Sequence, residues 1–237
     1  TITVAIKEGE NADGTPKYKE AVLENIQFKY NIKATVTTVA GIYNEAVAKD
    51  GPALEASFQR PVMLSVDNTG VILISDDDAK RVRFLSLQDN KVTTVLSGMN
   101  SPWQNTFNYK SDKFFVIERY TTLRPHLFTG LYKEDNWQEP DIFYDQKDAS
   151  GNYIAGNMRH YGIAADDDYI YVLSEYGTRF IRVHQITRKV ELIGQNLNMD
   201  SWSHIAMNKK NGMMYITAEG RGRLYRLNPY HIPAGHT

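Results

Sequence analysis

The chain has 237 residues, of which 42% are hydrophobic and 11% aromatic, enough apolar material for one large domain with or without a fragment of a second. Its net charge of −1 excludes an overall field that would draw it to nucleic acid or to an anionic membrane. Without cysteine it has no disulfide and no cysteine-based zinc site.

Residues 1–33 predict a short β segment that differs from the rest of the chain. TITVAIKEG at 1–9 is typical of a strand, ENADGTPKYKE at 10–20 of a charged loop, and AVLENIQFKYN at 21–31 of a second strand. We therefore expect residues 1–33 to form one unit and residues 34–237 another.

A four-strand pattern recurs from residue 34 onward. Each repeat begins with a strand that ends in Asp or Asn before a tight turn, at 63–67, 104–108, 162–166 and 204–208. A second strand rich in β-branched and aromatic residues follows at 71–75, 114–118, 169–174 and 213–219. A third strand of alternating character follows at 81–87, 126–132, 179–186 and 223–229, and three repeats continue into a fourth at 91–98, 140–146 and 189–194.

Repeated sheets of four antiparallel strands predict an all-β fold, a β-propeller with blades at about 58–98, 99–146, 156–195 and 200–229. The last repeat stops at its third strand, while ATVTTVAG at 34–41 resembles the fourth strand KVTTVLSG at 91–98. We therefore expect residues 35–41 to be an outer strand that closes the ring, since an open fan of sheets leaves edges exposed.

The first repeat resembles an NHL repeat, a four-stranded propeller blade. The likeness rests on Ala56, Phe58 and Pro61 before the first strand, on Val66-Asp67, on Asp76, and on Arg81-Val82-Arg83. The Asn-His-Leu core that names the family is absent, so the pattern of the blade carries the resemblance. NHL propellers have about six blades and four are visible here, so we expect either a four-bladed ring or, as we favour, a chain that lacks blades of the intact protein.

Residues 1–33 resemble the tail of an IPT/TIG immunoglobulin-like module, which precedes NHL repeats in a group of bacterial surface proteins, many of them lipoproteins of glycan or nutrient uptake systems. The alternative is an N-terminal extension that packs along the outside of the ring. The resemblance implies a place at the extracellular face of the outer membrane or in the periplasm. The sequence has no signal peptide, no spanning apolar run and no initial Met, so we expect a trimmed product held at a membrane only by a lipid anchor outside this chain.

In a propeller, the loops that lead into each first strand and the loops that join second and third strands lie on one side, here called the top face. Aromatic rings beside arginine and carboxylate groups suit a sugar or a peptide. The predicted ligand-binding residues of the top face are Arg60, Trp103, Arg119, Tyr120, His160, Tyr176, Trp202 and Arg221, with Asp76, Asp77, Glu118, Arg159, Glu175 and Glu219 nearby. The competing interpretation is that both tryptophans fill the core between blades and that the charges decorate turns.

Other chemistry has less support in the sequence. His160 and His204 lie at first strands, as metal-binding histidines do in lyases of similar fold, but no third ligand converges with them. The triplets Asp76–Asp78 and Asp166–Asp168 lack calcium-loop spacing, and the arginines of the third strands suit a solvated face better than a single-stranded RNA site.

We therefore expect a non-enzymatic binding protein without metal or cofactor, whose partners are a glycan or peptide and outer-membrane transport proteins. The alternatives are a structural propeller that binds proteins only, and a metal-dependent lyase in the propeller channel.

Overall fold

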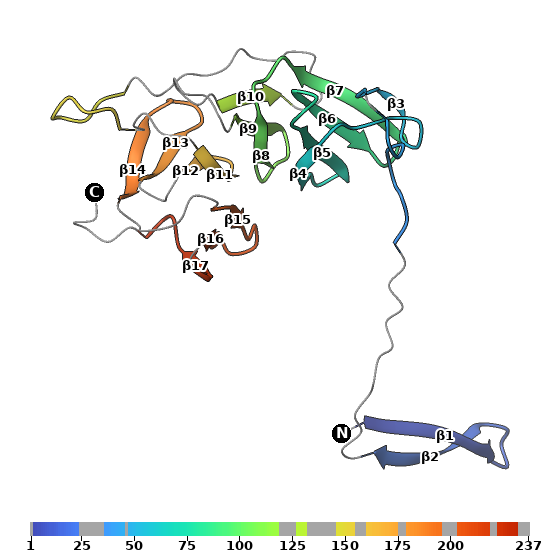
Figure 1. The fold of residues 1–237 in the computed structure, drawn as a ribbon. Helices are drawn as coiled ribbons and strands as arrows, with labels where there is room; N and C mark the ends of the chain where they lie inside the picture. Colours follow the sequence, from blue (N-terminus) through green and yellow to red (C-terminus); the bar gives the residue numbers. More distant parts are fainter. Residues whose placement is uncertain are drawn as a thin grey trace. The chain divides into compact units, whose positions relative to one another are not determined.

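The computed structural model describes residues 2–23, 36–45, 47–118, 127–131, 146–154, 160–174, 179–195, 203–218 and 222–231. The chain divides into two compact units, Thr1–Thr37 and Thr38–Thr237 (Figure 1). All named elements of the described residues are β-strands. No described helix is long and apolar enough to cross a membrane.

The first unit contains an antiparallel hairpin of β1 (Ile2–Glu10) and β2 (Pro16–Leu23). Its turn is built by Asp13, whose Oδ1 accepts hydrogen bonds from Thr15 N at 3.0 Å and Thr15 Oγ1 at 2.6 Å, and by Gly14 with φ +78°. The strand β2 thus begins inside the segment that we expected to be a charged loop up to residue 20. The Asp-Gly turn is tight enough that the chain reverses within a few residues and pairs at once.

The second unit holds four antiparallel sheets in chain order. The first sheet consists of β4 (Pro61–Val66), β5 (Val71–Asp76), β6 (Arg81–Ser86) and β7 (Lys91–Ser97), with β3 (Gly51–Pro52) at the outer edge. The second sheet consists of β8 (Pro102–Phe107), β9 (Lys113–Glu118) and β10 (Leu127–Leu131). The third sheet consists of β11 (His160–Ala165), β12 (Tyr169–Ser174), β13 (Arg179–His184) and β14 (Val190–Gln195). The fourth consists of β15 (Ile205–Met207), β16 (Met214–Ala218) and β17 (Arg223–Leu227).

These sheets are the blades of a β-propeller, as the sequence predicted. Apart from β3, the strands of each sheet pair in sequence order. The first strands of consecutive sheets contact one another: β4 with β8, β8 with β11, and β11 with β15 (Figure 1). The predicted fourth strand of the second blade, 140–146, lies outside the described residues except for Gln146. The total number of blades and the NHL-type assignment stay predictions.

The outer strand predicted at 35–41, which we expected to complete the last blade and so close the ring, is not formed by its described residues. Residues 36–41 form no strand, and Val36 and Val39 are exposed. Gly41, with φ +105°, turns the chain, and its N–H donates to Ala53 O at 2.9 Å. At the outer edge of the first sheet, the two-residue strand β3 pairs with β7.

Alternating side chains place the core between the sheets. One cluster joins the first and second sheets around Leu73, Val82 and Phe114. A second joins the second and third sheets around Phe115 and Ile117, and a third joins the third and fourth sheets around Tyr171, Phe180, Ile205 and Met214. Burying each large side chain contributes about 1.5–3 kcal/mol, so packing between blades holds this cysteine-free chain together.

Candidate functional site

At the top face of the first blade, Arg60 is tied down by carboxylates. Its guanidinium forms ion pairs with Asp77 and, at 3.0 Å from Nε to Oδ1, with Asp78. The other oxygen of Asp77 accepts a hydrogen bond from Ser101 Oγ at 2.7 Å, which joins the first blade to the loop that leads into the second. These ion pairs therefore hold the guanidinium of Arg60 in one orientation, although about half of its side chain is exposed to solvent.

Two further carboxylates that we placed near the ligand are buried and hold the backbone. Asp76, at the end of β5, accepts hydrogen bonds from Gln59 N at 3.1 Å and from Arg60 N at 2.7 Å. Glu118, at the end of β9, accepts one from Asn100 N at 2.7 Å. In both blades a carboxylate at the end of the second strand thus fixes the loop before the first strand, which supports a structural role for these two groups.

Trp103, in β8, is half-buried and packs against the core cluster between the second and third sheets. Arg60 and Trp103 both lie where first strands begin, since β4 starts at Pro61 and β8 at Pro102. The structure therefore brings these two predicted residues to the same ends of neighbouring blades.

The other predicted ligand residues are not described in full. His160 is the first residue of β11, and its backbone pairs with Ser174. The remaining members of the set lie outside the described residues: Arg119, Tyr120, Tyr176, Trp202 and Arg221, together with Arg159, Glu175 and Glu219. Their place on the top face stays a prediction.

In the acidic triplet Asp166–Asp168, the carboxylate of Asp166 accepts hydrogen bonds from other groups of the chain. Oδ1 of Asp166 accepts from the N–H of Asp168 at 2.8 Å and of Tyr169 at 2.6 Å, and its Oδ2 accepts from the hydroxyls of Tyr171 and Tyr230. Burial and the charge of Asp166 raise the pKa of both tyrosines. In the described part of the chain no group of three or more His, Asp or Glu side chains could hold a metal ion.

Most described arginines of the third strands bind within the chain. Arg81 donates to Ala48 O at 3.1 Å, and Arg179 donates to the carbonyls of Tyr153 and Ile154, both at 2.6 Å. Arg182 pairs with Glu191 at 2.6 Å. These contacts favour an architectural use over a basic patch for nucleic acid.

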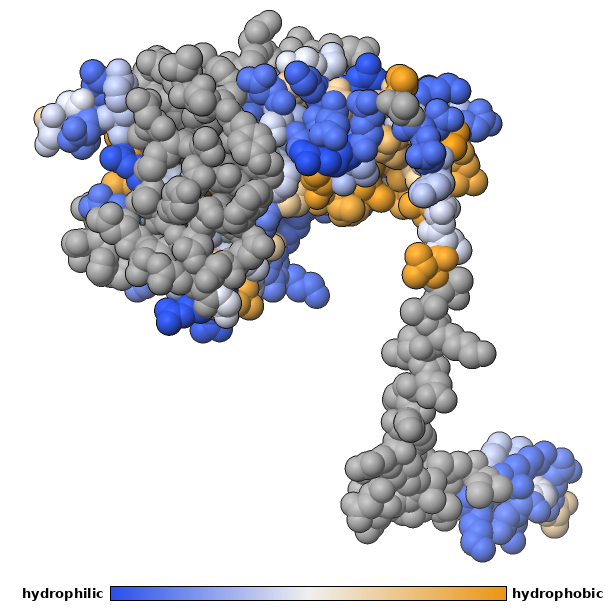
Figure 2. Space-filling view, in the orientation of Figure 1, coloured by the Kyte–Doolittle hydropathy of each residue, from blue (hydrophilic) through white to orange (hydrophobic). Residues whose placement is uncertain are grey.

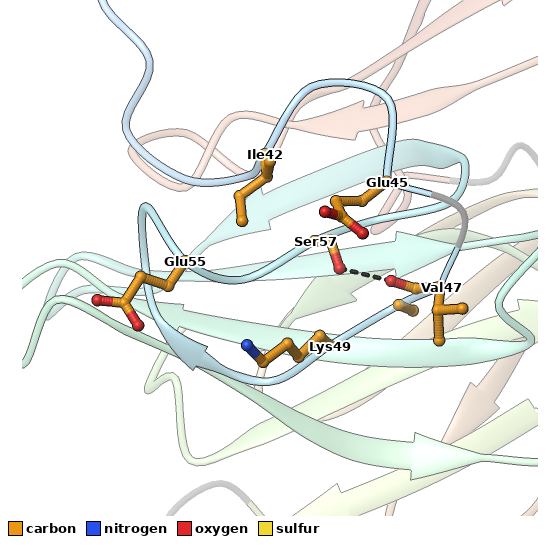
Figure 3. A pocket seen from close by; sticks show the side chains of 7 residues that line it. Ile42, Glu45, Val47, Lys49, Glu55 and Ser57 are labelled. Atoms are coloured by element: carbon orange, nitrogen blue, oxygen red, sulfur yellow. Dashed lines mark hydrogen bonds between the residues drawn. The ribbon is translucent and has the colours of Figure 1, made fainter.

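A cleft that we did not predict lies in the loop before the first blade (Figure 3). Its volume is about 270 Å³, and its lining combines apolar side chains with three charged groups and a hydroxyl: Ile42, Glu45, Val47, Ala48, Lys49, Glu55 and Ser57. The space is slightly below the roughly 300–1,000 Å³ of drug-sized sites, so it suits a single small group. The loop lies outside the repeated strands, so the repeat pattern gives no signal for this cleft.

The fully buried Arg83 in β6 braces the walls of this cleft. Its guanidinium donates to Lys49 O at 2.8 Å and to Ser57 O at 3.1 Å, and it pairs with Asp50 at 2.6 Å and with Asp76 at 3.5 Å. Ser57 Oγ in turn donates to Val47 O at 2.5 Å (Figure 3). The loop is thus fastened to the first blade by charge-assisted hydrogen bonds.

No protein-family model and no curated protein matches this sequence. A structural-genomics protein of unknown function from Bacteroides thetaiotaomicron aligns with a TM-score of 0.65 and 20% identity, over 92% of this chain and 52% of that one. An auxiliary nutrient binding protein from the same bacterium aligns with a TM-score of 0.61 and 18% identity, over 91% of this chain and 50% of that one. Virginiamycin B lyase from Staphylococcus aureus aligns with a TM-score of 0.50 and 15% identity, over 75% of this chain and 57% of that one.

This chain thus spans about half the length of the two Bacteroides proteins. At such identities the likeness concerns the fold: the chain shares its architecture with these proteins, and its second unit is a β-propeller.

Proposed function

We propose that this chain is a non-enzymatic binding protein of a bacterial cell surface, an accessory component of a nutrient uptake system that holds a glycan on its top face. The observation that carries the proposal is the fold shared with an auxiliary nutrient binding protein over 91% of this chain. The proposal includes an NHL-type propeller, an IPT/TIG-like first unit, and a place in the periplasm or at the outer membrane. A lipid anchor outside this chain would hold the protein at the membrane, and outer-membrane transport proteins would be its partners.

The geometry of Arg60 and Trp103 supports a carbohydrate ligand. Packing fixes the indole ring of Trp103, and the ion pair with Asp77 fixes the guanidinium of Arg60. Groups that are already ordered lose little conformational entropy on binding, and an aromatic face covers the C–H surface of a sugar while arginine donates to its hydroxyls. Trp202, Tyr120 and Tyr176 would extend this surface across the neighbouring blades.

Affinity electrophoresis in gels that contain bacterial and plant polysaccharides tests this function. We expect the protein to be retarded by at least one polysaccharide, and Trp202→Ala to weaken retention at least about tenfold, because a central aromatic contact contributes about 2 kcal/mol or more. The matched control is Trp137→Ala, the third tryptophan, which is not assigned to the top face. Trp103→Ala should weaken binding and also lower the melting temperature, since Trp103 packs against the core.

Two outcomes would contradict the proposal. A protein that no polysaccharide retards, but that co-purifies with membrane transport proteins, would be a structural propeller without a small ligand. A stoichiometric metal ion that is lost in His160→Ala would instead indicate a lyase in the channel.

A further inference from the structure

The cleft in the loop before the first blade has walls that the rest of the chain holds in place. Lys49 and Ser57, which both line it, pair as an isolated antiparallel bridge. The buried Arg83 binds the carbonyl oxygens of these two residues, at 2.8 and 3.1 Å. The cleft is therefore formed before a ligand arrives, which lowers the entropic cost of binding.

The loop before the third blade has the same construction. Lys147 and Tyr153 form its isolated antiparallel bridge, as Lys49 and Ser57 do in the first loop. A third-strand arginine again binds the second residue of the bridge, since Arg179 donates to Tyr153 O at 2.6 Å. The two loops are thus built around corresponding lysines.

Both loops also meet the outer strand of their blade in the same way. Oδ2 of Asp50 accepts a hydrogen bond from Thr94 N in β7, and Oε1 of Gln146 accepts one from Val190 N in β14, both at 2.8 Å. Each acceptor is adjacent in sequence to the lysine of its bridge. The two bridges are therefore equivalent, and the first loop has a serine where the third has a tyrosine.

The two lysines differ in what lies next to their ammonium groups. Lys147 Nζ lies 4.8 Å from the centre of the Tyr153 ring, a cation–π contact within the chain. In the first loop the equivalent Ser57 supplies no ring, and the space beside Lys49 is the cleft of about 270 Å³. A cavity of about 150 Å³ can hold benzene, so this cleft has room for an aromatic ring with a short side chain.

Two carboxylates line the same cleft. Glu45 and Glu55 surround it together with Lys49 (Figure 3), and none of these three side chains forms an ion pair with any described residue. Carboxylates outnumber ammonium groups in the lining, and the buried Arg83 behind it is already paired with two further carboxylates. The electrostatic potential of the cleft therefore favours a ligand that carries a positive charge.

Apolar side chains lie beside these charges. Ile42 and Val47 line the cleft and are 41% and 69% exposed. Figure 2 shows hydrophilic and hydrophobic surface side by side on the first blade and the loop before it. A ligand can thus bury an apolar body here while its charged end has a partner.

We propose that this cleft binds a small aromatic amine, a molecule with an aromatic ring and an ammonium group on a short aliphatic arm. Its ring lies against Lys49, as Tyr153 lies against Lys147, and its ammonium pairs with Glu45 and Glu55. An aromatic amino acid fits less well, because its carboxylate would face the same glutamates. This ligand differs in chemistry from the glycan proposed for the top face, so the cleft adds a second binding function.

Isothermal titration calorimetry of the 237-residue chain with tyramine tests this site. We expect saturable binding of one tyramine per chain. Para-ethylphenol, which lacks the ammonium, and butylamine, which lacks the ring, should each bind at least about tenfold more weakly, since each loses one of the two contacts.

Variants at exposed positions place the ligand in the cleft. Glu45→Gln/Glu55→Gln should weaken tyramine binding about tenfold, because each exposed ion pair changes affinity by up to about fivefold. The matched control is Glu10→Gln in β1, which should bind like the parent. Melting temperatures of all variants verify that the chain is folded.

Carbon–proton correlation NMR tests the position of the ring. Tyramine should shift the Cε protons of Lys49 upfield, because an aromatic ring shields protons above its face, and Lys49→Met identifies this signal by its loss. The Cε protons of Lys147 are the control and should not move, since Tyr153 already occupies that place.

The other outcomes overturn the proposal. If tyramine shows no saturable binding, or if Glu10→Gln weakens it as much as the double variant does, the cleft does not bind amines. If butylamine binds as tightly as tyramine, or if the signal of Lys49 does not shift, charge alone holds the amine and no ring occupies the cleft.

Discussion

Carboxylate side chains at the top face of the first blade stabilise the fold of the chain. Asp76 and Asp77 were candidates for contacts with a ligand, and the structure shows each of them bound to groups of the chain itself. The reason is that a loop packed on a sheet edge has N–H groups that need acceptors, and a buried carboxylate supplies them. Arg83 completes this arrangement, because it neutralises Asp50 and Asp76 while it ties down the loop between them.

Removing Arg83 should therefore destabilise the second unit strongly. In Arg83→Met, packing is partly kept but Asp76 stays buried without its cation, and loss of one partner of a buried pair costs about 3–5 kcal/mol. Urea unfolding followed by tryptophan fluorescence measures the change. The matched control, Arg223→Met, concerns an exposed arginine and should stay within about 0.5 kcal/mol of the parent. Equal stability of both variants would refute the role given to Arg83.

Asp50 predicts how stability responds to acid. Burial alone would raise the pKa of Asp50, but the hydrogen bonds from Thr94 N and Oγ1 and the charge of Arg83 together hold this pKa below its ordinary value. A lowered pKa in the folded state means that the stabilisation is present above the pKa of the unfolded chain, about 3.9, and is lost as the pH falls through the folded value. Asp50→Asn should thus lower the urea midpoint at pH 7 and reduce its decline between about pH 5 and pH 3. A decline as steep as in the parent would show that Asp50 does not contribute.

At the scale of elements, alternation and turn chemistry predicted the strands of the four blades well. The segments 71–75, 114–118 and 169–174 coincide with β5, β9 and β12 to within a residue or two. The exceptions are short or isolated. The strand β2 begins before the apolar residues from which we predicted it, and β3 has only two residues. Both segments are strands because they pair with a neighbouring strand, not because of their own alternation of apolar and polar residues.

The close approach of β11 and β15 depends on Gly162. A Cβ at this position would lie 2.8 Å from Ile205 Cγ1 and 3.2 Å from Ser203 O. Gly162→Ala should therefore cost about 1–3 kcal/mol through overpacking, measured by thermal or urea unfolding.

The exposed Ala206→Val in β15 serves as the control for this change. Because the clash is with Ile205, the double variant Gly162→Ala/Ile205→Ala should be less destabilised than the sum of the single variants. If the free-energy changes of the two single variants simply add, the strain does not arise from contact between position 162 and Ile205.

At the scale of the molecule, the second unit is a row of blades that share cores with their neighbours. Each internal sheet buries both faces, whereas the first and fourth sheets each leave large apolar side chains exposed at one end. The gel experiment above addresses this scale, since the predicted ligand residues of the top face come from several blades.

The sequence alone determined the repeated four-strand blade and hence the propeller, because strand pattern and turn residues are local properties that recur along the chain. It also placed Arg60 and Trp103 at the starts of first strands. Only the tertiary structure decided that Asp76 and Glu118 bind backbone N–H groups and that Arg83 braces a cleft in the preceding loop. It also decided that Leu64 in the first strand of the first blade is exposed, whereas Ile163 and Ile205 in the first strands of the last two sheets are buried. These outcomes depend on which segments become neighbours in space, and burial and hydrogen bonding act between such neighbours whatever their separation in the chain.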